Sequence, residues 1–72
     1  MNRRANTWLV VTTLSNAHGH EIALFGKASY DEEVDLLTVT SLTPTKGLQQ
    51  VTQAGGFPIE TLAKHLLRAL FP

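Results

Sequence analysis

The stretch that decides the fold is residues 8–28, WLVVTTLSNAHGHEIALFGKA. Its first part, residues 8–14, consists of β-branched and large apolar types that alternate between two faces and suit a pleated strand. Residues 21–28 show the same alternation. Between the two runs, Asn16 can start a type I turn and Gly19 can take the left-handed position that follows it. We predict an antiparallel β-hairpin.

Both faces of this hairpin carry apolar side chains. In its first strand, Trp8 and Val10 lie on one face, and Leu9 and Val11 lie on the other. We expect the C-terminal half of the chain to cover one face, and the other face needs a cover that the sequence leaves unstated. A homodimer is the simplest candidate for that second cover.

Residues 29–42 offer two local structures. Ser29 and Glu32 have the Ser-x-x-Glu spacing of a capping box, which favours the start of a helix. Residues 34–42 are rich in β-branched types, and their apolar positions scatter around a helical wheel, which favours a strand. We predict a short acidic turn followed by a third strand, with a helix as the alternative.

Residues 43–54 suit a short helix. A threonine is in place to cap it, Pro44 would occupy the first helical position, and a Gly-Gly pair follows residue 54. The apolar residues that recur at helical spacing are Leu48, Val51 and Ala54. Glycine is unfavourable inside a helix, so a turn ending at Gly47 that leads into a fourth strand is the alternative. We predict the helix.

Residues 58–70 form the most regular helical pattern of the chain, and Pro58 opens it. The apolar stripe consists of Ile59, Leu62, Ala63, Leu66, Leu67 and Leu70. The opposite face carries Glu60, Thr61, Lys64, His65 and Arg68. This separation predicts an amphipathic helix that packs its leucine stripe on the sheet.

Residues 48–67 resemble the helix-turn-helix of bacterial winged-helix and related repressors. The matching positions are an aliphatic residue in the first helix, a glycine in the turn, an apolar residue that plugs the angle between the helices, a helix cap and three positions of the second helix. In this sequence they are Val51, Gly56, Phe57, Pro58, Thr61, Leu62 and Leu66. The predicted fold class is therefore α+β: a small antiparallel sheet, made of the N-terminal hairpin and the third strand, followed by two helices in a helix-turn-helix-like arrangement. An ordinary helical hairpin packed on a sheet also fits this spacing.

The resemblance implies a surface for nucleic acid on the second helix. It would present Thr61, Lys64, His65 and Arg68 to DNA. Lys64 and Arg68 would reach phosphates or guanine edges, and Thr61 would reach a phosphate.

Composition limits the class of protein. The chain has 72 residues and 7.9 kDa, with 43% hydrophobic and 17% charged residues, which predicts one folded domain spanning residues 1–72. It contains no cysteine, which excludes a disulfide framework and a thiolate metal site. No apolar run reaches the roughly 20 residues of a membrane-spanning helix. We expect a cytoplasmic protein without a membrane partner.

Nothing in the sequence predicts an enzyme or a cofactor. No Ser-His-acid arrangement, Gly-rich phosphate loop or pair of carboxylates in an apolar setting is found. His18 and His20 flank a turn glycine, and we predict no metal site there. The acidic residues Asp31, Glu32 and Glu33 form either a solvated turn or a docking patch for a basic partner.

These observations predict a small non-enzymatic regulator of transcription that binds DNA through its C-terminal unit. The alternative is a small phage- or plasmid-type protein that binds and inhibits or modulates a host protein, such as part of the transcription machinery. In that case a sheet edge, the helix face or the acidic turn at Asp31, Glu32 and Glu33 would make the contact.

Overall fold

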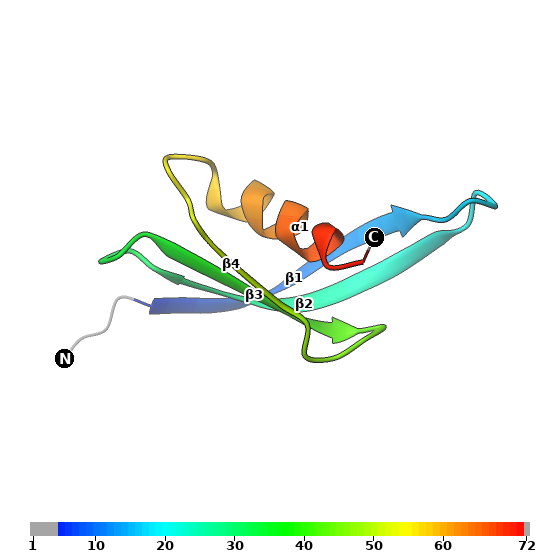
Figure 1. Cartoon of the computed structure of the whole chain (residues 1–72), viewed down its shortest axis with the longest axis horizontal. Coiled ribbons are helices and arrows are strands. Elements are labelled where there is room, and N and C mark those ends of the chain that lie inside the picture. Colours follow the sequence, from blue (N-terminus) through cyan, green and yellow to red (C-terminus); the bar gives the residue numbers. More distant parts are fainter. Residues whose placement is uncertain (1–4, 72) are drawn as a thin grey trace.

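A computed structural model describes residues 5–71 as one antiparallel sheet followed by one helix (Figure 1). The elements are β1 (Ala5–Ser15), β2 (Glu21–Asp31), β3 (Leu36–Thr43), β4 (Gln49–Gln53) and α1 (Ile59–Ala69). Each strand pairs with its neighbour in sequence, so the strand order is β1-β2-β3-β4. The predicted fold class is therefore wrong, because the described chain has one helix where two were expected.

The β1–β2 hairpin follows the predicted pattern. Its register runs unbroken from Ala5 opposite Asp31 to Ser15 opposite Glu21. The side-chain oxygen of Asn16 accepts the N–H groups of His18 at 2.9 Å and His20 at 3.0 Å, and Gly19 has a φ of 81°. The hairpin turn therefore forms as its sequence predicts.

The hairpin is longer than the strand beside it. β2 pairs with β3 only over Phe25–Asp31, so the far end of the hairpin projects beyond the sheet as a two-stranded arm (Figure 1). The pairing shifts between Phe25 and Gly26, which is where the arm leaves the four-stranded part. A β-bulge at such a position bends the strand locally.

Asp35 joins the turn after β2 to the loop before α1. It adopts a left-handed conformation with a φ of 57°, which asparagine and aspartate tolerate better than most residues. Its carboxylate accepts the hydroxyl of Tyr30 at 2.6 Å and the N–H of Gly55 at 2.9 Å. Its C=O accepts the N–H of Ala54 at 3.2 Å. Of the two alternatives for residues 34–42, the strand is confirmed, although it starts at Leu36.

The helix predicted over 43–54 is absent, and its place is taken by a turn and β4. Gly47 takes a φ of 99°, a turn conformation that a helix does not contain. The buried hydroxyl of Ser41 donates to the C=O of Thr45 and accepts the N–H of Leu48 at 2.9 Å. The N–H of Ser41 also donates to the C=O of Leu48 at 2.7 Å. Pairing with β3 outweighs the local helical spacing, and the alternative of a fourth strand is what forms.

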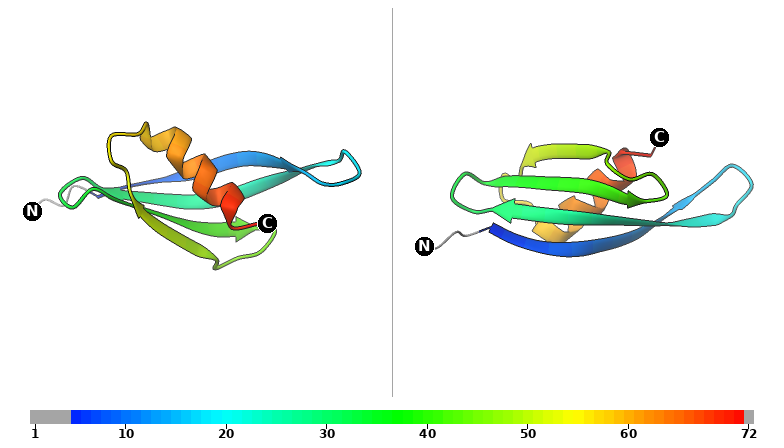
Figure 2. Two further views of the ribbon diagram at one scale, coloured as in Figure 1. Left: turned by 45° about the horizontal axis from the view of Figure 1, so that its top comes forward. Right: turned by 90° about the horizontal axis from the view of Figure 1, so that it is seen from below.

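α1 crosses one face of the sheet and leaves the other face bare (Figure 2). Ala63 and Leu67 are fully buried against the sheet. The sheet residues of this core are Val10, Leu24, Ala28, Leu37 and Val39. A Cβ at Gly26 would lie 2.8 Å from Cδ1 of Leu67, so glycine there lets the helix approach closely.

α1 has 11 residues, and no helix in the described part of the chain is long and apolar enough to cross a membrane.

Candidate functional site

The predicted DNA-reading unit is not assembled. Val51, expected on a first helix, lies in β4, and Gly56 belongs to the loop between β4 and α1. Phe57, expected to plug the angle between two helices, is 68% exposed. A helix-turn-helix needs a first helix to set the angle of the second, so this resemblance is wrong.

The residues predicted to contact nucleic acid do share one surface. They lie on α1, and all four are exposed: Thr61, Lys64, His65 and Arg68. The surface faces away from the sheet, because Ala63 and Leu67 on the opposite side are buried. Their role in binding stays a prediction.

The acidic residues predicted as a docking patch lie at the turn between β2 and β3. Glu32 and Glu33 are exposed, and Asp31 is half-buried. The carboxylate of Asp31 accepts the N–H of Glu33 at 3.0 Å. Asp35 differs from these three because its carboxylate is held by Tyr30 and Gly55. The patch therefore consists of Glu32 and Glu33, with Asp31 partly engaged in shaping the turn.

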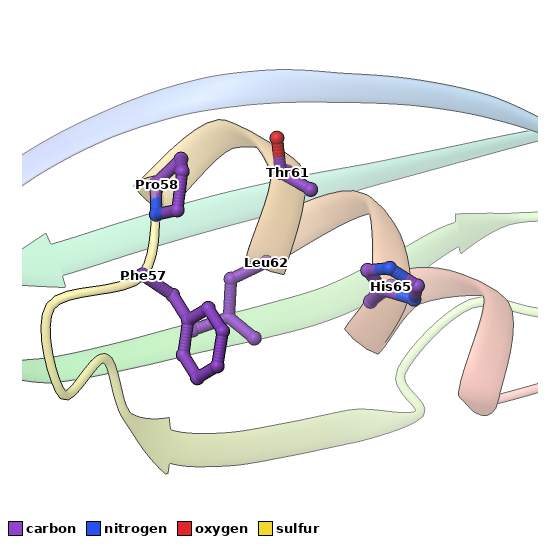
Figure 3. A pocket seen from close by; sticks show the side chains of 5 residues that line it. All are labelled: Phe57, Pro58, Thr61, Leu62 and His65. Carbon is purple, nitrogen blue, oxygen red and sulfur yellow. The ribbon is translucent and has the colours of Figure 1, made fainter.

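A small open pocket lies beside the first turns of α1 (Figure 3). It has a volume of about 310 Å³ and is lined by Phe57, Pro58, Thr61, Leu62 and His65. Its walls are mostly apolar, with one hydroxyl and one imidazole at the rim. Such a notch suits an apolar side chain of a partner better than a chemical reaction, which would need convergent acid, base or nucleophilic groups.

The histidines of the hairpin tip do not assemble a metal site with other ligands. The rings of His18 and His20 lie with their centroids 6.4 Å apart. Within residues 5–71, no group of three or more histidine, aspartate or glutamate residues could hold a metal ion.

Several exposed apolar side chains lie on the face of the sheet opposite α1, which we call the uncovered face. Leu9 is 68% exposed, Val11 48% and Phe25 40%, although all three lie in regular strands. Val11 and Phe25 stand directly opposite each other in the β1–β2 pair, and Leu9 shares their face because side chains alternate along a strand. These three residues form one apolar cluster at the β1 side of the uncovered face.

The rest of the uncovered face is mainly polar. One row across the sheet contains Thr7, Ser29, Thr38 and Val51, and the next contains Leu9, Lys27, Thr40 and Gln49. The side-chain amide of Gln49 donates to the hydroxyl of Thr40 at 3.1 Å. Lys27 therefore places a positive charge near the centre of the face, between the apolar cluster and a band of hydroxyl groups.

Sequence patterns located part of this surface. The apolar character of both hairpin faces predicted that one face would lack a cover. The patterns missed the contribution of Val51, because residues 49–53 were predicted to be helical, and they missed the central place of Lys27, which needs the β2–β3 register.

In the described residues, the uncovered face combines an apolar cluster with polar groups and one positive charge. No protein-family model matches the chain, and neither a curated protein nor a solved structure matches it.

Proposed function

We propose that this protein is a small non-enzymatic regulator that acts by binding another protein through the uncovered face. The observation that carries the proposal is the adjacent exposure of Leu9, Val11 and Phe25 on a sheet whose other face is covered by α1. Scattered exposed apolar residues are ordinary, but contiguous ones on a small protein are characteristic of interaction sites.

The surroundings of this cluster indicate the chemistry of the partner. Thr7, Thr38 and Thr40 can hydrogen-bond at the margin of an interface, and Lys27 supplies one positive charge. Interfaces typically combine an apolar centre with a polar rim. The partner should therefore present a complementary apolar surface with a carboxylate placed opposite Lys27.

Two finer features belong to the same proposal. We infer that the protein acts in the cytoplasm and that its target belongs to the transcription machinery. Contact between nucleic acid and Thr61, Lys64, His65 and Arg68 would have to come from α1 alone, without a helix-turn-helix. The experiment below separates that contact from protein binding.

The test is capture of the target by the tagged protein, followed by affinity measurement with the purified target. Leu9→Thr and Val11→Thr place a β-branched, strand-compatible side chain at each position but remove apolar surface, so each should weaken binding by at least about tenfold. Lys64→Ala and Arg68→Ala, which change the exposed face of α1, serve as matched controls and should bind normally. Nuclease treatment should leave the capture unchanged.

Three results would contradict the proposal. They are capture that is unaffected by Leu9→Thr and Val11→Thr, capture lost in the α1 variants, and capture lost after nuclease treatment. Loss of binding in Glu32→Gln and Glu33→Gln alone would instead assign the contact to the acidic turn.

A further inference from the structure

The outer edge of β1 is a second surface with unused binding capacity. In the part of the chain that the structure describes, no strand pairs with this edge. The N–H of Asn16 donates to the C=O of His20 at 2.9 Å, which fixes the alternation of the antiparallel ladder. The even-numbered residues of β1 therefore bond to β2, and the odd-numbered residues direct their N–H and C=O groups outward.

This edge lacks the features that normally keep sheet edges from pairing. Such features are charged side chains, prolines, bulges and short strands. β1 has 11 residues, ANTWLVVTTLS, with no charge and no proline, and its register with β2 has no shift. The opposite edge, β4, has only 5 residues, of which three are glutamines. Of the two edges, β1 is therefore the one better suited to pair with another strand.

We propose that a second copy of this chain pairs with β1 in the antiparallel direction, joining the two four-stranded sheets into one. The two-fold axis passes beside Val10, the midpoint of Ala5–Ser15, so that the whole strand takes part. The argument for a second copy is that the strand is complementary to itself in this register.

On the uncovered face, this register matches side chains of the same kind, whereas on the face under α1 it sets Asn6 opposite Leu14 and Trp8 opposite Thr12. With full overlap, Leu9 stands opposite Val11 of the second copy, and Thr7 stands opposite Thr13 of the second copy. Moving the axis to residue 9 would place Thr7 opposite Val11, and moving it to residue 11 would place Leu9 opposite Thr13. Opposed pairs of like character stabilise an antiparallel pair, and no charges meet in any of these registers.

The dimer would leave the uncovered face available. A two-fold axis between antiparallel strands stands perpendicular to the sheet, so both α1 helices lie on one side and both uncovered faces on the other. The two clusters of Leu9, Val11 and Phe25 would then adjoin across the axis. The hydrogen bonds of the pairing come from backbone groups of the edge, side chains only set its register, and the pairing does not depend on the proposed function of the face.

The register can be tested by disulfide cross-linking, because the chain contains no cysteine. Residues opposed in a hydrogen-bonded pair have Cα atoms about 5.5 Å apart, within the range for a disulfide. Identical residues two positions out of register are about 7–8 Å apart. A mixture of Leu9→Cys and Val11→Cys proteins should therefore form the mixed disulfide in preference to either homodimer. Phe25→Cys, on the same face but in central β2, should not cross-link.

Sedimentation of the wild-type protein and two variants tests the edge itself. Wild type should form a dimer as its concentration is raised, and Phe25→Lys should form the same dimer. Leu9→Pro removes an N–H group that points outward from the edge, so this variant should remain a monomer. The proposal is overturned by a wild-type monomer, by a dimer lost in Phe25→Lys, which would mean face-to-face packing, or by preferential cross-linking of identical positions. If Leu9→Pro fails to fold, the cross-linking result decides.

Discussion

At the scale of single residues, Asp35 connects parts of the chain that are distant in sequence. Its carboxylate accepts hydrogen bonds from the Tyr30 hydroxyl and the Gly55 N–H, so it fixes the loop before α1 to the turn after β2. The hydrogen bond from Tyr30, followed by that from Gly55, lowers the pKa of Asp35 below its ordinary value. The same bond to Asp35 raises the pKa of Tyr30 above its ordinary value.

These shifts set the pH range over which the contact stabilises the fold. Because the pKa of Asp35 is lower in the folded state, its contribution is present above the unfolded pKa of about 3.9 and is lost as the pH falls through the folded value. Because the pKa of Tyr30 is higher in the folded state, its contribution is present below about pH 10 and is lost as the pH rises further. The contact is therefore complete across the neutral range.

Tyr30→Phe tests this contact. Removing the hydroxyl removes the main cause of the shift, so the pKa of Asp35 should rise toward its ordinary value, and acid unfolding should begin at a higher pH. Carboxyl titration by NMR measures the first effect, and circular dichroism against pH measures the second. The other carboxyl groups in the same spectra serve as internal controls. An unchanged Asp35 titration would show that the Tyr30 hydroxyl does not act on this carboxylate.

At the scale of elements, the sequence predicted those parts whose cause is local. The alternation over 8–14 and 21–28 gave the hairpin, and the leucine stripe after Pro58 gave α1. The segment 43–54 was mispredicted because its local features fit a helix, while its strand depends on β3. Ser41 holds the turn between them through contacts with Thr45 and Leu48 that no local periodicity reveals.

Ser41→Ala tests that dependence. The substitution leaves the N–H of Leu48 without its side-chain acceptor and the C=O of Thr45 without its donor, so unfolding free energy should fall by about 1–3 kcal/mol. Urea denaturation measures the loss, and hydrogen exchange should be faster across β4. Ser29→Ala, on the uncovered face, is the matched control and should change stability little. Equal stability of both variants would show that β4 forms without the hydrogen bonds of the Ser41 hydroxyl.

The candidate site was predictable only in part from the sequence. Alternation along the hairpin showed that both faces are apolar, but it did not show which face α1 would cover. The structure places Val10 under the helix and leaves Leu9 and Val11 exposed. The choice depends on how the helix stripe meets the sheet, which is a matter of packing between segments far apart in sequence.

At the scale of the whole molecule, one helix and one sheet face provide nearly all of the core. The fully buried apolar residues in the described chain are few and mostly small or medium in size: Val10, Leu24, Ala28, Leu37, Val39, Ala54, Ala63 and Leu67. A folded unit as small as the described residues 5–71 buries a smaller fraction of its surface than a larger one, so we expect its stability to be modest. Each large core side chain therefore carries a substantial share of that stability.

Leu67→Ala measures this share. Leu67 is fully buried and lies over Gly26, so its truncation leaves a cavity that a rigid sheet cannot close and should cost about 2–5 kcal/mol. A loss of that size approaches the stability of a small domain, so the variant should be largely unfolded or melt far below wild type. Phe57→Ala is the control, since this side chain is 68% exposed and its removal should leave the melting temperature nearly unchanged. Thermal denaturation of the three proteins at one concentration makes the comparison. If Leu67→Ala melts with wild type, α1 must pack on the sheet through a different side of the helix.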